Sequence, residues 1–273
     1  MPLSYDFFSD AERELNEEFL ANGYVIKPVA DLEMLNSLRQ GIVEIVCKHM
    51  GIDVPKDLDD FLNSFADYIS IEKLNELRLA TYRAMNAEDW FRPTYYAVAK
   101  PHLSTLVGNE LAMQNRVNLS IQLPNDNSSL LPIHADAFGG ETPYQVVQWL
   151  PLVNCYKTKS MFILPRPKCE QIYEAFEKFG EGGLVGLFES VKDDLVWLNV
   201  PYGHVLIFSP NNLHGGVVNV ENETRWSMNT RFTGLFTPYR GAEKKLGSYY
   251  LPITTRAVTK TGISYKEPAG FEE

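Results

Sequence analysis

The sequence predicts a fold of the α+β class that is mainly β, with a helical first part and a strand-rich second part. Two observations along the 273-residue chain predict it. Apolar residues recur at helical spacing in the first 110 or so residues, and at a spacing of two from about residue 113. In the second part, short strand-like runs alternate with clusters of Gly, Pro and Asn. This pattern is typical of a sandwich, a barrel or a jelly roll.

The helical part begins at about residue 10, where Ser9 or Asp10 can cap a helix that Asn22-Gly23 stops. A short strand at Tyr24-Val25-Ile26 follows, and Pro28 ends it. The next helix, over 30–50, has its leucines and isoleucines at the helical period. Further helices are expected near 57–68, 71–85 and 93–110.

In the strand-rich part, residues 116–123 alternate strictly between polar and apolar. The polar face of this strand lies either in water or in a cavity, and the periodicity does not separate the two. Other strands are expected at 144–151, 160–164, 196–199, 204–209, 215–219 and 225–236. An insertion at 166–195, with a helix from Cys169 to Phe179, interrupts them.

Composition narrows the class of protein. Hydrophobic residues make up 45% and charged residues 22%, which excludes a disordered chain and a coiled coil. The net charge of −10 disfavours nucleic acid and anionic membrane as partners. No apolar run is long enough to span a membrane, and the first ten residues do not form a secretory signal. Three cysteines without a Cys-x-x-Cys pair are expected to be free thiols, so we expect a cytoplasmic protein.

Two of the five histidines have a context that suggests metal binding. In a strand, His134 and Asp136 would point to the same side. His214 follows 80 residues later. Two histidines and one carboxylate can hold Fe(II) and leave positions open. A His-x-Asp pair alone is more often a solvated surface pair.

Downstream of His214, polar residues alternate with apolar ones and therefore share a strand face. Arg225 and Ser227 on this face could receive a carboxylate, through the guanidinium fork and a hydroxyl donor. Asn229 and Arg231 continue the face and could reach a substrate. The alternatives are a surface strand with paired charges and, for Arg231, an ion pair with an Asp or Glu.

Together, His134-x-Asp136, His214 and Arg225-x-Ser227 resemble the motif His-x-Asp … His-x10-Arg of Fe(II)/2-oxoglutarate-dependent oxygenases. Segments in the same order resemble the phytanoyl-CoA dioxygenase-like branch, over about residues 12–236. They are 18–26, 148–152, 160–165 and 203–208. His204 departs from the branch, in which Gly-Asp is common at this turn. Residues 132–136, 142–145, 149–152 and 159–161 are similar to oxygenases found sporadically among bacterial surface-carbohydrate genes.

The resemblance implies a double-stranded β-helix, or jelly roll, with the N-terminal helices packed on one sheet. The chain would form a single oxygenase domain over residues 1–273. Its parts would be a helical support region (1–112), a jelly-roll core (113–240) with the insertion 166–195, and a C-terminal extension (241–273). Loops 86–100, 137–143 and 165–195 would shape the substrate pocket.

The resemblance also implies the cofactors and the roles of the site residues. Fe(II) would be held by His134, Asp136 and His214, with O2 as oxidant. The cosubstrate 2-oxoglutarate would pair with Arg225 and Ser227. Further cosubstrate contacts are expected from Gln122, Asn118 and Trp149, although Trp149 is equally expected as a core residue. Asn229 and Arg231 are expected to contact substrate.

The implied reaction is hydroxylation of a small polar substrate, such as a sugar or sugar nucleotide, with release of succinate and CO2. Two alternatives stay open: a cupin-like metalloenzyme without 2-oxoglutarate, and a non-catalytic carbohydrate-binding jelly roll. A homodimer is compatible with the sequence, which does not define the oligomeric state.

Overall fold

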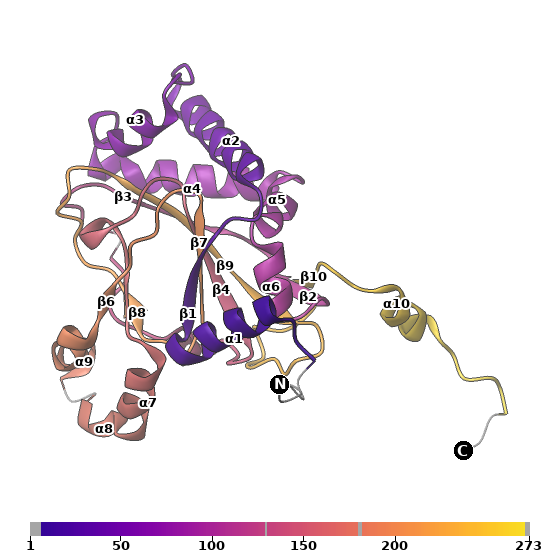
Figure 1. The fold of residues 1–273 in the computed structure, drawn as a ribbon. Helices are drawn as coiled ribbons and strands as arrows, with labels where there is room; N and C mark the ends of the chain where they lie inside the picture. The colour runs from indigo at the N-terminus through magenta and orange to yellow at the C-terminus, as the bar shows by residue number, and fades with distance from the viewer. Residues whose placement is uncertain (1–6, 129, 180–181, 271–273) are drawn as a thin grey trace.

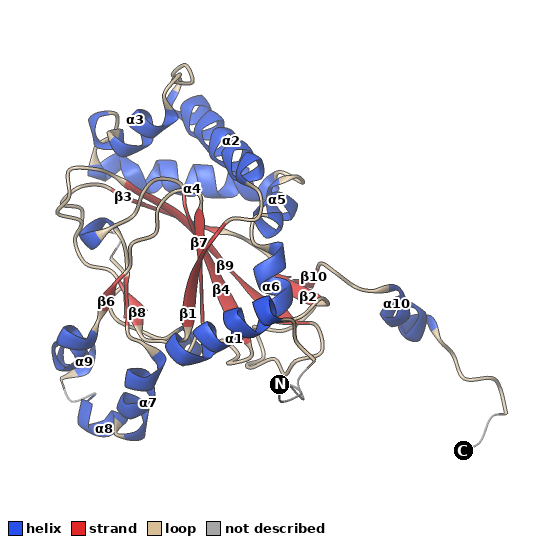
Figure 2. Cartoon of the chain, in the orientation of Figure 1, coloured by secondary structure: helices blue, strands red, loops and turns tan. Residues whose placement is uncertain are grey.

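Two antiparallel sheets, with helices packed around them, make up the computed structural model of the chain (Figures 1 and 2). It describes residues 7–128, 130–179 and 182–270. The larger sheet has the order β1-β7-β4-β9-β2-β10, with β3 also paired to β9. The smaller sheet has the order β6-β5-β8. The expected mixture of helices and antiparallel strands is therefore confirmed.

The strands of the larger sheet are β1 (Tyr24–Pro28), β2 (Leu111–Gln114), β3 (Asn118–Gln122), β4 (Gln145–Pro151), β7 (His204–Phe208), β9 (Arg225–Gly234) and β10 (Tyr250–Pro252). Those of the smaller sheet are β5 (Phe162–Ile163), β6 (Val196–Trp197) and β8 (His214–Gly215). Strand β9 is central, because β4 pairs along one side of it while β2 and β3 share the other. An isolated bridge between His134 and His214 adds the segment before β4 to the edge of the smaller sheet.

The helices are α1 (Asp10–Asn22), α2 (Leu32–Met50), α3 (Leu58–Asn63), α4 (Ile71–Ala87), α5 (Phe91–Ala97), α6 (Lys100–Leu106), α7 (Arg166–Glu174), α8 (Phe176–Phe179), α9 (Gly183–Val191) and α10 (Ala257–Ser264). Four short 3-10 helices are η1 (Phe65–Asp67), η2 (Asp136–Gly139), η3 (Lys157–Lys159) and η4 (Lys192–Asp194). None of the helices in the described residues is both long enough and apolar enough to cross a membrane.

Sequence signals account for the first elements. Ser9 forms a capping box with Glu12 at the start of α1, and Gly23 ends the helix in the left-handed conformation. Helix α2 buries one face, which includes Leu35, Leu38 and Ile42, as its spacing predicted. Both helix predictions are confirmed.

The N-terminal helices are joined to the larger sheet by buried polar contacts as well as by apolar packing. The Tyr95 hydroxyl of α5 donates to the Gln148 carbonyl of β4 at 2.9 Å. The Trp226 indole of β9 donates to the Leu62 carbonyl of α3 at 3.0 Å. The side chains of these helices and of β4, β7 and β9 form one hydrophobic cluster. The cluster supports the back of the sheet region that carries the site.

Two helix predictions are wrong in extent. The helix expected at 93–110 is interrupted near Ala99, giving α5 and α6, because Pro101 fits only the first turn of a helix. The helix expected from Cys169 to Phe179 starts earlier, at Arg166, and is divided at Ala175 into α7 and α8. Helix α9 was not predicted, since its Gly-rich start does not have helical propensity.

The strands expected at 144–151, 204–209 and 225–236 match β4, β7 and β9 to within two residues at each end. The strand expected at 215–219 is wrong in extent, because β8 covers only His214–Gly215. Its partner β5 has two residues and is followed closely by Pro165, which has no N–H for a ladder. The pairing of β10 with β2 was also not predicted. Figure 1 shows α10 beyond β10, on the chain leading to the C-terminus.

Candidate active site

The His134, Asp136 and His214 side chains form a cluster that could hold a metal ion. One ligand atom from each lies within 4.8 Å of the other two, and no other such cluster occurs in the part of the chain that the structure describes. The two histidines are neighbours because their segments pair. His134 N–H donates to the His214 carbonyl at 2.9 Å, and His214 N–H donates back at 2.8 Å. Although Asp136 begins η2, Ala135 is extended, so His134 and Asp136 share a side as predicted.

Backbone carbonyls fix which nitrogen of each imidazole faces the cluster. His134 Nδ1 lies 2.7 Å from the Pro132 carbonyl, and His214 Nδ1 lies 2.9 Å from the Asn212 carbonyl. Because a carbonyl only accepts, Nδ1 carries a proton, and in the neutral imidazole Nε2 then keeps its lone pair. Burial, together with nearby His134, lowers the pKa of His214 to about 4. A neutral imidazole with a free Nε2 is the form that binds metals.

The Asp136 carboxylate is ionised and its two oxygens have different neighbours. Oδ1 lies 3.6 Å from His134 Nε2, while Oδ2 accepts a hydrogen bond from Arg231 Nε at 3.0 Å and forms an ion pair with Arg231 Nη2 at 2.7 Å. Burial opposes ionisation, but the nearby His134 and the charge of Arg231 lower the pKa of Asp136 well below its usual range. The three groups therefore present two neutral nitrogens and one anionic oxygen, a set suited to a divalent metal.

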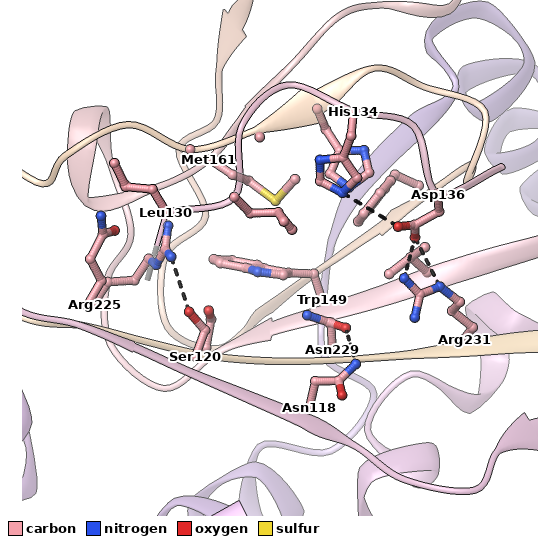
Figure 3. Close-up of a pocket in the computed structure, with 18 of the residues that line it drawn as sticks. Asn118, Ser120, Leu130, His134, Asp136, Trp149, Met161, Arg225, Asn229 and Arg231 are labelled. Carbon is pink, nitrogen blue, oxygen red and sulfur yellow. Dashed lines mark hydrogen bonds and ion pairs between the residues drawn. The ribbon is translucent and has the colours of Figure 1, made fainter. Parts of the chain in front are cut away.

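A cavity of about 430 Å³ opens in front of this cluster (Figure 3). All ten residues that the sequence singled out line it. They are Asn118, Gln122, His134, Asp136, Trp149, His214, Arg225, Ser227, Asn229 and Arg231. They come from β3, β4, β8, β9, η2 and the bridge at His134. The polar face of β3 thus faces a cavity, which decides between the two interpretations of its alternation.

At one end of the cavity, Arg225 has no acidic partner. Its Nη2 donates to Ser120 Oγ and its Nη1 to the Ser160 carbonyl, both at 3.2 Å. No carboxylate lies within 4.0 Å of it among the described residues. Burial lowers the pKa of Arg225 from its ordinary value. Arg225 Nε, Ser227 Oγ and Gln122 Oε1 are buried and have no hydrogen-bond partner among the described residues. A cation beside an unused hydroxyl suits a carboxylate.

The rest of the polar wall is occupied by paired side chains. Asn118 and Asn229 lie opposite each other on β3 and β9, and Asn118 Nδ2 donates to Asn229 Oδ1 at 3.0 Å. Arg231, expected to reach the substrate, has its guanidinium on Asp136 and on Gln114, so the ion-pair alternative is the one observed. Trp149 is buried and its ring lies along the cavity (Figure 3).

Several lining residues were missed. The predicted pocket loops 86–100, 137–143 and 165–195 contribute none of the lining residues that the structure describes. The wall is completed instead by Arg78 of α4, by Leu130 and Leu131 before the metal cluster, and by Met161 next to β5. Arg78 lies on a helix whose apolar spacing predicted only a scaffold, and the two leucines lie in a segment without periodicity. No sequence signal pointed to Arg78 or to the two leucines, while Met161 lies in a segment that carries the family resemblance but was given no role in the site.

Comparisons with known proteins give no match at the level of sequence. No protein-family model matches the chain, and no curated protein sequence matches it.

Solved structures with a similar fold do exist. The non-heme monooxygenase ThoJ, in its nickel complex, has a TM-score of 0.56 at 15% identity, covering 94% of this chain and 89% of ThoJ. HygX from Streptomyces hygroscopicus, with nickel and 2-oxoglutarate bound, has a TM-score of 0.53 at 13% identity, covering 83% and 88%. The non-heme, α-ketoglutarate-dependent carbocyclase SnoK from nogalamycin biosynthesis has a TM-score of 0.50 at 15% identity, covering 93% and 100%. These likenesses, at 15% identity or less, establish the fold alone.

Proposed function

We propose that this chain is an Fe(II)- and 2-oxoglutarate-dependent oxygenase with a jelly-roll core of the phytanoyl-CoA dioxygenase-like type. One observation carries the proposal. A two-histidine, one-carboxylate cluster and a partly buried arginine without an acidic partner among the described residues lie on the wall of the same cavity. A metal ligand set alone would fit many functions. The arginine adds a place for the carboxylate of a second ligand beside the metal.

The metal half of the site fits Fe(II). Two Nε2 lone pairs and Asp136 Oδ1 point at one place, and this set leaves positions open around a six-coordinate ion. The carbonyls of Pro132 and Asn212 hold the imidazoles in orientation, as is usual for histidines that bind metals. ThoJ and HygX have been solved with nickel, which supports a divalent metal in this fold.

The arginine half of the site fits the distal carboxylate of 2-oxoglutarate. Arg225 would pair with that carboxylate, and Ser227 would donate its hydroxyl to it. We assign further contacts with the cosubstrate to Gln122, Asn118 and Trp149, which lie on the same wall. Bound Fe(II) and 2-oxoglutarate would together supply the oxidation by O2, with release of succinate and CO2.

The substrate is proposed to be a small polar molecule, with a sugar or sugar nucleotide as the first choice, and the reaction to be hydroxylation. The Asn118–Asn229 pair keeps one amide oxygen and one amide nitrogen for other partners, and such groups suit hydroxyls of a substrate. The apolar side chains of Leu130, Trp149 and Met161 limit access of water on the other side. SnoK is a carbocyclase, so cyclisation by the same site is the first alternative to hydroxylation.

The test is visible absorption of the purified protein without oxygen, titrated with Fe(II) and then with 2-oxoglutarate. We expect a weak charge-transfer band that needs both additions, disappears in His134→Ala and is weakened in Arg225→Gln. Iron binding without such a band would favour a cupin-like metalloenzyme. Absence of metal binding would overturn the proposal in favour of a non-catalytic, carbohydrate-binding protein. If the band forms, sugars and sugar nucleotides are screened as substrates by the succinate that the enzyme forms from 2-oxoglutarate in their presence.

A further inference from the structure

We propose that Arg231, backed by the buried Glu141, is a positioning residue that holds Asp136 so that one oxygen alone, Oδ1, faces the metal. The inference rests on the proposed function, because it concerns the same metal site. It assigns to Arg231 a support role in place of the substrate contact that the sequence suggested.

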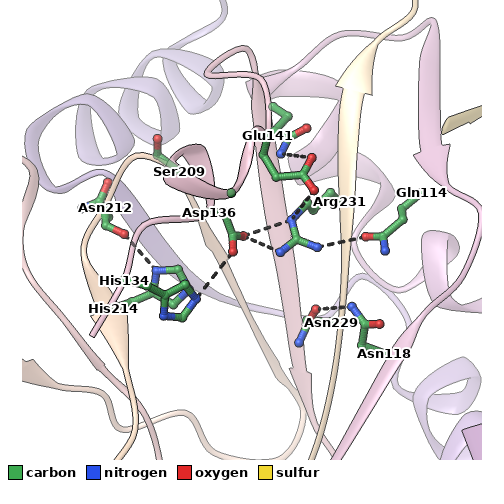
Figure 4. Close-up of polar contacts among 12 residues, drawn as sticks. Gln114, Asn118, His134, Asp136, Glu141, Ser209, Asn212, His214, Asn229 and Arg231 are labelled. Atoms are coloured by element: carbon green, nitrogen blue, oxygen red, sulfur yellow. Dashed lines mark hydrogen bonds and ion pairs between the residues drawn. The ribbon is translucent and has the colours of Figure 1, made fainter. Parts of the chain in front are cut away.

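The two oxygens of Asp136 have separate partners in the structure. Arg231 directs both Nε and Nη2 at Oδ2, at 3.0 and 2.7 Å. Oδ1 is left on the side of the histidines, 3.6 Å from His134 Nε2 (Figure 4). Turning Oδ2 away from the guanidinium would break the charge-assisted hydrogen bond from Nε and the close ion-pair contact with Nη2 at once. The guanidinium therefore acts as a stop on rotation of the carboxylate.

Arg231 is itself held on its other side. Its Nη1 donates to Gln114 Oε1 of the adjacent strand β2 at 3.1 Å. Its Nε also lies 3.8 Å from Glu141 Oε1. Figure 4 shows the guanidinium between Asp136, Glu141 and Gln114. With these partners, the fork has no freedom to follow a moving carboxylate.

Glu141 anchors the arrangement, and its own partners come mainly from the C-terminal segment. Glu141 is 1% exposed. Oε1 accepts from Lys244 Nζ at 2.8 Å and from the Tyr249 hydroxyl at 3.1 Å. Oε2 lies 2.6 Å from the Tyr250 hydroxyl and 3.1 Å from Gln145 Nε2. A buried acid with this many donors stays charged and in place, so the segment around β10 supports the metal site from behind.

Fixing the carboxylate has a chemical use. A carboxylate that is free to rotate can bind a metal through both oxygens and occupy a position that a second ligand needs. A ligand held by the side chains around it keeps the metal geometry and raises affinity, because less freedom is lost on binding. Arg231 would thus protect the open positions in which the cosubstrate and O2 are expected.

The experiment compares the same substitution at two places on one strand face. Arg231→Gln, Arg231→Lys, Glu141→Gln and, as matched control, Arg225→Gln are titrated with Co²⁺ by calorimetry. The ligand-field absorption of bound Co²⁺ is recorded as well, because it reports the coordination number. We expect about 10–100-fold weaker Co²⁺ binding in Arg231→Gln, with an altered Co²⁺ spectrum. In Arg231→Gln, the affinity for 2-oxoglutarate at saturating metal should stay within about twofold of the wild type, because the proposed cosubstrate contacts are separate from those of Arg231 and the two effects should be independent. Arg225→Gln should give the reverse pattern.

The other variants keep the proposal testable if Arg231→Gln does not fold. Arg231→Lys can still reach Oδ2 with one N–H, so it should retain more Co²⁺ affinity than Arg231→Gln. Glu141→Gln should lose affinity about severalfold, because it acts through Arg231. Wild-type Co²⁺ affinity and spectrum in the folded variants at both positions would overturn the inference. Failure of the wild type to bind Co²⁺, Fe²⁺ or Ni²⁺ would instead count against the proposed function.

Discussion

Two arginines six residues apart on the cavity face of β9 have opposite surroundings. Arg231 forms an ion pair with Asp136 at 2.7 Å and lies 3.8 Å from Glu141. Among the described residues, the hydrogen-bond partners of Arg225 are neutral, and its Nε has no partner. The residue type, the strand and the face are the same, so the difference comes from what the neighbouring strands bring to each position.

This difference indicates that Arg231 is a structural support for the site, whereas Arg225 is a receptor for a ligand. Burying a charge costs free energy unless a partner compensates it. Arg231 has that compensation inside the protein, so it can stabilise the folded chain without any ligand. Arg225 does not, and a ligand that carries a carboxylate would compensate it. Positions that depart from the rules of stability are where function is expected, and the Arg225 end of β9 is such a position.

Removing Asp136, the acid that pairs with Arg231 and not with Arg225, should have the largest effect on activity. Asp136→Ala deletes a proposed metal ligand and leaves Arg231 nearest to Glu141 alone. We expect 2-oxoglutarate-dependent succinate release to fall to background, because two imidazoles do not hold Fe(II) tightly. Succinate release and calorimetric Ni²⁺ titration measure both consequences. Undiminished turnover would remove Asp136 from the ligand set.

Replacing each arginine by methionine should change the stability of the metal-free protein in different directions. Arg231→Met leaves the Asp136 carboxylate buried without its cation, so we expect a loss of about 3 kcal/mol in the free energy of unfolding. Arg225→Met removes an uncompensated charge, and the expected change is between zero and a gain of about 1 kcal/mol. Urea denaturation of the two variants gives both values. Equal losses would mean that Arg225 has a compensating partner in solution.

Features of this site that depend on residues close in the sequence were predicted. Features that depend on contacts between distant segments were not. Arg225 and Arg231 follow from alternation along one strand, and their common face is correct. What differs between them is set by Asp136 and Glu141, which lie in the segment leading into β4, the strand that pairs with β9. No local pattern encodes that distance. The same holds for Tyr249 and Tyr250, which lie in the segment expected to be a C-terminal extension and which contact Glu141.

The fold follows the same division. Elements with a strong local signal, such as α1 with its cap at Ser9 and β9 with its alternation, are placed within two residues. Short elements that exist because a partner strand is present, such as β8 and β10, were misjudged or missed. Leu130, Leu131 and Arg78 line the cavity only because the chain folds over it. Tertiary contacts therefore decide which of these residues line the pocket, while the His-x-Asp … His … Arg motif indicates the chemistry that we propose for it.

Ligand-induced stabilisation should depend on Arg225 and not on the metal cluster alone. With Ni²⁺ saturating, 2-oxoglutarate at a concentration 100 times its Kd should stabilise the wild type by about 2.7 kcal/mol. For a chain of this size, this corresponds to a rise of roughly 5–10 °C in Tm. Arg225→Met should lose most of that rise but keep the rise caused by Ni²⁺. An unchanged response to 2-oxoglutarate would place its carboxylate elsewhere.

The smallest expected effect is on 2-oxoglutarate affinity, and it is tested by comparing two buried hydroxyls, one inside the cavity and one outside it. Ser227 Oγ and Thr224 Oγ1 are both buried without a partner among the described residues, but only Ser227 lines the cavity. Ser227→Ala removes a donor proposed for the cosubstrate carboxylate, which should weaken 2-oxoglutarate binding by about 1.4 kcal/mol, or about tenfold. Thr224→Val removes a hydroxyl that no ligand is proposed to use, so its Kd for 2-oxoglutarate should match the wild type.

Neither substitution should destabilise the ligand-free protein, because neither hydroxyl has a hydrogen bond to lose among the described residues. Calorimetric titration of 2-oxoglutarate into the two Ni²⁺-loaded variants makes the comparison, with thermal melts as the control for folding. Equal affinities in the two variants would remove Ser227 from the receptor and leave Arg225 to bind the carboxylate alone. A tenfold difference with unchanged melting temperatures would show that an unpaired hydroxyl in this cavity is a binding group, while the same group three residues earlier in the chain is not.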